Sequence, residues 1–386
     1  KKKIDYRQYL ALAKFPLFKI GRYKSGMIAQ ERNIRLNPYQ NMGYRTIGLA
    51  REQNSVGLEL SYDTVLKGRN GRQLVRAIAG GVTVPVQEGE FEIAPETGKD
   101  IVSNLDVFIQ EVTTNALNKM MVQNQAQWGV AMVMEVKTGK IKAIANLGKI
   151  AEGVYREDLN YAITPSEPGS TFKLVTLLSA LEDGKVNLNS SIDLEGGAWK
   201  VVGQTVWDSE QHGKHQATVL EAFEESSNVG MAKIAVNNYT NNPSAYFKHL
   251  SRLRLDSLSG IDLVGERRPQ ITRPGDKLWG PTTLPWMAFG YNIAIAPIQT
   301  LTLYNMVANN GVMMHPYLVN SIQEEGRIIK TNSPKAFNLR AYSPATIKAA
   351  QTALEGVCIN GTGKNLFKNS PYKVAGKTGT ALVANG

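Results

Sequence analysis

The chain has 386 residues, of which 42% are hydrophobic and 20% charged, and its formal net charge is +11. This composition is typical of a globular protein, and the length predicts two domains with a sizeable buried core. Its one cysteine, Cys358, excludes an intramolecular disulfide. The only close pair of histidines, His212 and His215, has no cysteine or carboxylate pattern around it, which favours a surface loop over a zinc site.

Most of the positive charge lies at the N-terminus. Residues 1–40 hold ten lysines and arginines against two acidic residues, a net charge of +8. No zinc knuckle, helix-turn-helix or RNA-binding aromatic pattern accompanies them, so nucleic-acid binding is not predicted. Three explanations of the basic segment stay open: it faces an anionic lipid surface, it faces an acidic polymer, or it is simply a solvated basic surface. No apolar run reaches the ~18 residues that would span a bilayer, and no signal peptide is visible.

The predicted elements begin with an extended, mostly β module over residues 1–100, because short apolar pieces alternate there with basic and glycine-rich ones. Its end, residues 86–98, is rich in turn formers and acid and predicts a linker. Apolar residues at a period near 3.6 then predict an amphipathic helix over 104–121, which opens a second domain. The later predicted elements are a hairpin (128–135 with 141–145), helices over 171–181, 222–236 and 296–308, and a strand over 374–383.

Three short motifs follow one another in this second domain: Ser170-Thr-Phe-Lys173, Ser226-Ser-Asn228 and Lys377-Thr-Gly-Thr380. A serine hydroxyl needs a base before it becomes a nucleophile. Lys173 follows Ser170 by three residues at the start of a predicted helix, so the two share a helix face. Burial and the nearby cation of Lys377 would lower the pKa of Lys173 and let it accept the proton. Each motif taken alone has an ordinary structural explanation: a helix cap with a surface lysine for the first, a helix cap for the second and a hairpin edge for the third. The occurrence of all three motifs in this order favours serine acyl transfer.

The second and third motifs supply the remaining groups. Ser226 and Asn228, two residues apart, can relay a proton and hold a substrate carbonyl. Gly379 leaves room for a peptide to lie alongside in β-pairing. The backbone N–H groups of Ser170 and Thr380 would form an oxyanion hole. The side chains expected to bind a carboxylate are those of Lys377, Thr378 and Thr380.

Together these motifs resemble the penicillin-binding proteins, the serine acyl-transferases that cross-link peptidoglycan and are acylated by β-lactams. The segments that resemble the class B, monofunctional branch are Glu167-Pro-Gly-Ser-Thr-Phe-Lys173, Ser226-Ser-Asn-Val-Gly230, Gly361-Thr-Gly-Lys364 and Ala375-Gly-Lys-Thr-Gly-Thr-Ala381. Residues 45–48, 57–60 and 66–68 look like the pedestal domain of that branch. The resemblance implies an α+β protein. A mainly β pedestal would cover residues 1–100, and a β-lactamase-like transpeptidase domain, an antiparallel sheet flanked by helices, would cover 101–386.

The same resemblance implies a peptidoglycan D,D-transpeptidase of septal cell-wall synthesis, with no metal or organic cofactor. Ser170 would be the acylated nucleophile and Lys173 its proton acceptor. Ser226 would pass the proton to the leaving D-alanine, and Asn228 would bind the substrate amide. The implied partners are stem peptides, lipid-linked precursor strands, β-lactams and division proteins including a glycosyltransferase. The implied location is the cytoplasmic membrane, with the catalytic domain on its outer, periplasmic side.

Several alternatives stay open beside this interpretation. An elongation-type transpeptidase or a D,D-carboxypeptidase would use the same residues, and a β-lactam sensor or a division scaffold would need less chemistry. A class A β-lactamase is disfavoured because no Glu-x-x-Leu-Asn occurs between Asn228 and Lys377. The family carries a membrane anchor before the pedestal, and further strands with a helix after the Lys-Thr-Gly strand. We therefore expect these 386 residues to lack both.

Overall fold

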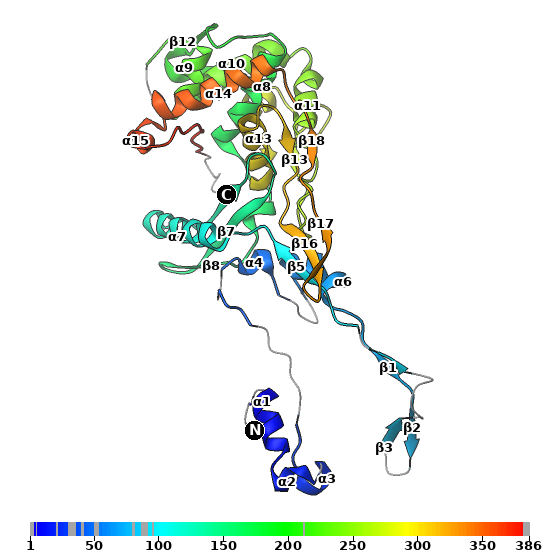
Figure 1. The fold of residues 1–386 in the computed structure, drawn as a ribbon. Coiled ribbons are helices and arrows are strands. Elements are labelled where there is room, and N and C mark those ends of the chain that lie inside the picture. The colour runs from blue at the N-terminus through cyan, green and yellow to red at the C-terminus, as the bar shows by residue number, and fades with distance from the viewer. Residues whose placement is uncertain are drawn as a thin grey trace. The chain divides into compact units, whose positions relative to one another are not determined.

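A computed structural model describes residues 4, 6–20, 22–29, 36–39, 42–49, 54–78, 82–85, 92–94, 96–210 and 213–380. The chain divides into two units, residues 1–41 and residues 42–386 (Figure 1). The first unit contains three short helices: α1 (Tyr6–Ala13), α2 (Pro16–Lys19), which Pro16 opens, and α3 (Arg22–Ser25). None of the described helices combines the length and the apolar character needed to cross a membrane.

The second unit also begins with short helices, so the mostly β prediction is wrong for the segments that form α1, α2 and α3 and for residues 44–66. Helices α4 (Tyr44–Ile47), α5 (Gly57–Ser61) and α6 (Asp63–Leu66) are too short for a helical period to show in the sequence. Gly48 joins them through a close backbone approach, because a Cβ there would lie 1.7 Å from the carbonyl oxygen of Val56. Two short antiparallel strand pairs follow: β1 (Arg72–Gln73) with β4 (Glu92–Ile93), and β2 (Val75–Ile78) with β3 (Val82–Pro85).

The linker predicted over residues 86–98 is only partly testable. Residues 86–91 and 95 lie outside the described residues, as do His212 and the last three residues of the strand predicted over 374–383. The described part of the predicted linker contains β4, which pairs with β1. A domain boundary at residue 100 remains a prediction.

Two antiparallel sheets form the lower part of the second unit. The helix predicted over 104–121 and the hairpin that follows are confirmed as α7 (Val107–Asn124), β6 (Trp128–Met134) and β7 (Ile141–Ala151). With β8 (Val154–Arg156) the strands order as β6-β7-β8, and α7 lies alongside β7 and β8 (Figure 1). The second sheet has the order β17-β16-β5, from β17 (Arg327–Thr331), β16 (Val319–Glu324) and β5 (Asp100–Ser103).

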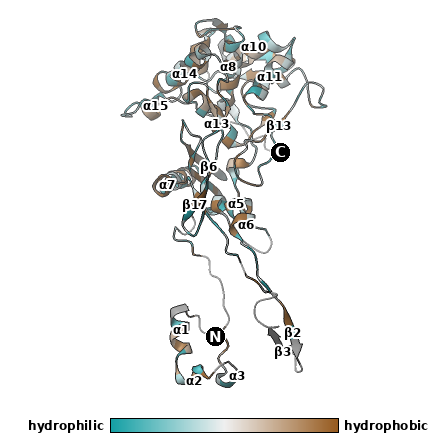
Figure 2. Cartoon of the chain, turned by 45° about the vertical axis from the view of Figure 1, so that its right-hand side comes forward, coloured by the Kyte–Doolittle hydropathy of each residue, from teal (hydrophilic) through white to brown (hydrophobic). Residues whose placement is uncertain are grey.

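A helical layer above the sheets surrounds α8 (Lys173–Glu182), in which eight of ten residues are buried. Helices α10, α11 and α14 pack against α8, and they carry hydrophilic residues as well as hydrophobic ones (Figure 2). The helices of this layer are α9 (Val219–Glu224), α10 (Asn228–Tyr239), α11 (Pro243–Arg252), α12 (Thr283–Met287), α13 (Pro297–Ala308), α14 (Pro344–Ile359) and α15 (Lys364–Phe367). Helix α13 confirms the prediction over 296–308, and Pro297 opens it.

The remaining elements are short. The 3₁₀ helices are η1 (Tyr161–Ile163), η2 (Gly169–Phe172) and η3 (Glu195–Gly197). The paired strands are β9 (Ser191–Asp193) with β12 (Gln216–Thr218), β10 (Ala198–Val201) with β11 (Gln204–Trp207), β13 (Gln270–Ile271) with β14 (Ile293–Ala294), and β15 (Met313–Met314) with β18 (Ala336–Asn338).

Candidate active site

The first motif forms the turn that leads into α8. Ser170 lies in η2 and is 5% exposed, and Lys173 opens α8 with no exposed surface. Ser170 therefore lies next to the helix N-terminus, as predicted. The backbone N–H of Gly169 donates to the carbonyl of Gly290 over 3.3 Å. Only glycine fits at position 290, because its φ is +96° and a Cβ would lie 2.1 Å from the Gly169 carbonyl oxygen.

The two motif lysines meet at the hydroxyl of Ser226. Lys173 Nζ donates to Ser226 Oγ over 3.0 Å and to the Ser226 carbonyl oxygen over 2.5 Å. Lys377 Nζ donates to the same Oγ over 2.7 Å. The structure thus brings one residue from each of the three motifs together, around a hydroxyl that is almost fully buried.

Burial sets the protonation of both lysines. It is the main cause that holds the pKa of Lys173 well below its usual range, and the charge of Lys377 lowers this pKa further. The carboxylate of Asp208 opposes the change. Burial also lowers the pKa of Lys377 to about 8. Lys173 is therefore the group suited to accept a proton near neutral pH, and Lys377 is the one suited to carry charge.

The helix predicted over 222–236 is confirmed from residue 228 onward as part of α10 but is wrong near its start, because the second motif separates α9 from α10 there. Ser226 adopts the left-handed conformation, with a φ of +60°. Ser227 caps α10: its Oγ accepts from the N–H of Gly230 over 2.9 Å. The same hydroxyl donates to Asp208 over 2.9 Å, and the N–H of Val229 also donates to Asp208. These bonds hold the break in place and aim Ser226 at the two lysines.

Asp208 is the residue that the sequence reasoning missed. It lies just after β11, about 20 residues before the motif that it anchors, and no local pattern marks it. The amide of Asn228 also reaches this segment, because its Nδ2 donates to the carbonyl of Trp207 over 2.7 Å. Trp207 at the end of β11 and Asp208 just after it therefore support Ser227 and Asn228 of the second motif.

The third motif lies against the first, but the strand predicted over 374–383 is absent among its described residues. A strand needs a ladder of hydrogen bonds to a neighbour. Here the N–H of Gly376 donates instead to the carbonyl of Leu354 on α14, over 3.0 Å. Gly379 lies so near Thr171 that a Cβ would be 3.0 Å from its Cγ2. Thr380 is exposed at the end of the described residues, so the oxyanion hole with Ser170 stays a prediction.

The loop after α14 connects the second and third motifs. The N–H of Thr362 donates to the carbonyl of Glu224 over 3.2 Å, and Thr362 Oγ1 shares a hydrogen bond of 2.6 Å with Thr378 Oγ1. Gly361 permits this contact, since a Cβ there would lie 2.1 Å from the Glu224 carbonyl oxygen. The segment Gly361-Thr362 thus fixes the position of Thr378.

The groups of this site are suited to proton transfer through Lys173 and Ser226 and to binding an anion through Lys377. Within the described ranges, no group of three or more histidine, cysteine, aspartate or glutamate side chains is placed to hold a metal ion. A buried serine, a lysine with a lowered pKa and a shared hydroxyl are the groups that serine acyl transfer uses.

Comparisons with known proteins agree with this geometry. A family profile described as the penicillin binding protein transpeptidase domain matches residues 129–386. Stage V sporulation protein D of Bacillus subtilis is 30% identical over 370 residues, 92% of this chain and 56% of that protein. Peptidoglycan D,D-transpeptidase FtsI of Escherichia coli is 25% identical over 385 residues, 98% of this chain and 60% of that protein. The chain thus spans a little over half the length of these curated relatives.

Solved structures show the same fold. A peptidoglycan synthetase from Bifidobacterium adolescentis is 25% identical, with a TM-score of 0.74 over 90% of this chain and 63% of that one. Penicillin binding protein 3 of the tuberculosis bacterium is 24% identical, with a TM-score of 0.73 over 90% of this chain and 76% of that one.

Proposed function

Because the chain belongs to the penicillin-binding protein transpeptidase family, we propose that it is a peptidoglycan D,D-transpeptidase with Ser170 as its nucleophile. The observation that carries the proposal is the hydroxyl of Ser226, which accepts hydrogen bonds from both Lys173 and Lys377. A hydroxyl in that position can take a proton from one lysine and pass it on to a leaving group.

In the proposed acylation, Ser170 Oγ attacks the carbonyl carbon between the two D-alanines of a stem peptide. Neutral Lys173 accepts the serine proton, as its lowered pKa allows. The new C–Oγ ester bond forms, and the C–N bond to the terminal D-alanine breaks. One proton returns through Ser226 Oγ to the amine that leaves. Lys173 is thereby neutral again when the acyl-enzyme has formed.

The third motif would hold the terminal carboxylate of the stem peptide. Lys377 supplies the charge, and the hydroxyls of Thr378 and Thr380 supply donors. Gly379 would leave space for the peptide backbone, and Asn228 would bind the substrate amide. The same groups would bind the carboxylate of a β-lactam, which would acylate Ser170 in the same way.

The setting of this chemistry follows from the family and belongs to the same proposal. An amine of a neighbouring stem peptide would release the acyl group as a cross-link during septal wall synthesis. Lipid-linked precursor strands and division proteins, including a glycosyltransferase, would be the partners. The catalytic domain would work on the outer side of the cytoplasmic membrane, and residues 1–100 would serve as the pedestal.

Intact-mass spectrometry after incubation with benzylpenicillin tests the proposal. The parent should gain one covalent adduct, and Ser170→Ala should gain none. An adduct that persists for many minutes would also exclude efficient hydrolysis. An adduct on the alanine variant as well, or peptide mapping to another serine, would remove Ser170 from its role.

A further inference from the structure

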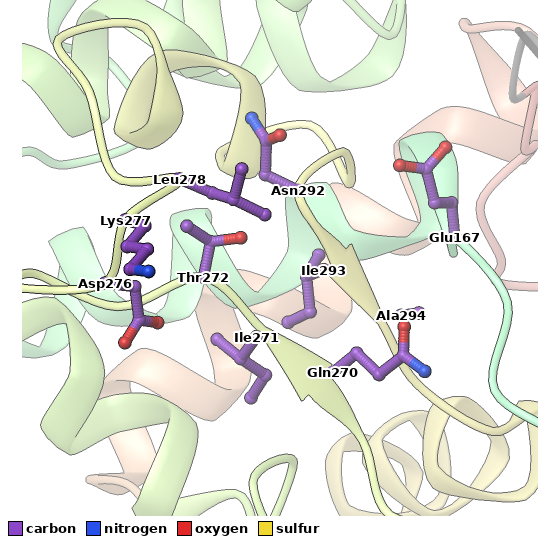
Figure 3. A pocket seen from close by; sticks show the side chains of 10 residues that line it. All are labelled: Glu167, Gln270, Ile271, Thr272, Asp276, Lys277, Leu278, Asn292, Ile293 and Ala294. Carbon is purple, nitrogen blue, oxygen red and sulfur yellow. The ribbon is translucent and has the colours of Figure 1, made fainter.

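A cavity of about 580 Å³ opens beside the turn that carries Ser170. Its walls are formed by Glu167, by the strands β13 and β14, and by the loop that follows β13 (Figure 3). The volume lies in the range of sites that hold small molecules and short peptides. None of the roles proposed above uses this cavity.

Backbone hydrogen bonds tie one wall of the cavity to the nucleophile turn. Ser166 and Ile295 exchange two hydrogen bonds of 3.0 Å, and the N–H of Gly169 donates to the carbonyl of Gly290. The wall residues Asn292 and Ile293 lie between these two anchor points. A molecule bound in the cavity would therefore be held in a fixed relation to Ser170.

The charged side chains of the cavity lie at its two ends. Glu167 is three residues before Ser170, and Lys277 lies across the cavity from it in the loop after β13 (Figure 3). Among the described residues, no hydrogen bond or ion pair engages either side chain. The other acidic residue, Asp276, already accepts from the N–H of Arg273 over 2.7 Å.

Between these ends the lining alternates amides and apolar groups. Gln270 and Asn292 offer amide donors and acceptors, and Ile271 and Ile293 form an apolar floor. Asn292 has a φ of +58°, an uncommon backbone conformation that is concentrated at functional positions. A carboxylate, amides, an apolar floor and an ammonium in this order complement a short peptide with a free amine at one end and a carboxylate at the other.

We propose that this cavity binds the acceptor of the transfer reaction, a short peptide whose ammonium group pairs with Glu167 and whose carboxylate pairs with Lys277. The inference rests on the proposed function, because only a transferase needs a second peptide beside its acyl-enzyme. It places the acceptor amine at the end of the cavity that is nearest in sequence to Ser170.

The bound ammonium first gives one proton to water. Its neutral nitrogen then attacks the carbonyl carbon of the Ser170 ester, so that a C–N bond forms and the C–Oγ bond breaks. The second proton of the attacking amine ends on Ser170 Oγ. Glu167 and Lys277 bind and orient the acceptor in this step and take no part in bond making.

The test uses a D-alanyl thioester as donor with triglycine or triglycinamide as acceptor. The quantity measured is the ratio of amide product to hydrolysis product over a range of acceptor concentrations. Since this ratio is taken per acyl-enzyme, it does not depend on how fast each variant is acylated. The variants are Glu167→Gln and Lys277→Met, and their matched controls on exposed sites are Glu152→Gln and Lys248→Met.

Glu167→Gln should raise the concentration for half-maximal amide formation about fivefold with both acceptors. Lys277→Met should raise it about as much with triglycine and leave it unchanged with triglycinamide, which lacks the carboxylate. Both controls should match the parent. An unchanged value for Glu167→Gln, or an equal effect of Lys277→Met on the two acceptors, would overturn the inference.

Failure of the proposed function gives a different result. If the thioester and benzylpenicillin both leave the parent without an acyl group, the transpeptidase proposal and this inference fall together. If the parent is acylated but forms no amide with either peptide, the acceptor site is refuted while the acylation chemistry stands.

Discussion

Replacing Lys377 with methionine removes the cation that lowers the pKa of Lys173. The Nζ atoms of both lysines donate to Ser226 Oγ, over 3.0 Å and 2.7 Å, so they are no farther apart than the sum of these distances, 5.7 Å. Two unit charges at that separation repel by about 3 kcal/mol at an effective dielectric constant of ~20. Since one pKa unit corresponds to about 1.4 kcal/mol, the pKa of Lys173 should rise by about two units in Lys377→Met.

The rate constant of acylation by a chromogenic cephalosporin, followed from about pH 5 to about pH 10, reports this change. Its rise with pH reflects the loss of a proton from Lys173. In Lys377→Met the midpoint of this rise should move by about two pH units to higher pH. The parent rate should also fall above about pH 8, where Lys377 loses its charge, and this fall should be absent in the variant. Lys248→Met, on an exposed site, is the matched control.

The midpoint of the rise is the quantity that tests the coupling between the two lysines, because it does not depend on how much the maximal rate falls. A rise at the same pH in Lys377→Met and in the parent would refute the electrostatic coupling between the two lysines. A rise at higher pH in Lys248→Met as well would show that the change is not specific to the site.

Three further predictions follow from single contacts. Both Ser226→Ala and Ser226→Gly should lower the rate of acylation about 10²-fold or more through loss of the proton relay. In urea unfolding, however, the glycine variant should be about 1 kcal/mol more stable than the alanine variant, because φ is +60° there; the reverse order would contradict the observed backbone. Burial raises the pKa of Glu157 to about 7 from an ordinary 4.5. The neutral, buried carboxyl therefore contributes its full stability below about pH 4.5, and this contribution is lost as the pH rises through 7 and the carboxyl becomes charged. Glu157→Gln should therefore raise the unfolding free energy by up to about 3 kcal/mol at pH ~8 and change it little at pH ~4; equal effects at both would argue against a buried neutral carboxyl. Gly361→Ala should destabilise the fold by about 1–3 kcal/mol, because its Cβ meets the Glu224 carbonyl, and unchanged thermal unfolding would show that this loop is not tightly packed.

The elements that the sequence predicts well are those with a local signature. The helix that becomes α8 follows Pro168-Gly169 and has a dense apolar pattern. The hairpin β6–β7 brackets the turn Lys137-Thr-Gly139. In both cases the residues that decide the structure lie within the element or next to it. These local residues are enough to predict that Ser170 lies at the start of a helix.

The break between α9 and α10 has no such signature. Ala222 and Val229 lie seven residues apart, which is the spacing of one helix face, so the pattern favours one helix although residues 224–228 between them are polar. What stabilises the break is distant: Lys173 donates to the Ser226 carbonyl, and Asp208 accepts from Ser227. A left-handed serine is tolerated because these contacts from elsewhere in the chain offset its cost.

The short helices α4 and α5 depend on distant partners in the same way. The N–H of Arg45 donates to the buried carboxyl of Glu157 over 2.6 Å, and Tyr62, just after α5, donates to Asp262 over 3.0 Å. Helices of four or five residues are not stable alone. Their conformation follows from contacts with distant parts of the second unit, which a single sequence does not display.

The role of Ser170 is tested by incubating the protein with a peptide that ends in D-alanyl-D-alanine, and by measuring both the released D-alanine and the mass of the protein. The parent should release D-alanine and carry the remaining acyl group on Ser170, whereas Ser170→Ala should do neither. Release of D-alanine at the parent rate by Ser170→Ala would show that Ser170 is not the nucleophile.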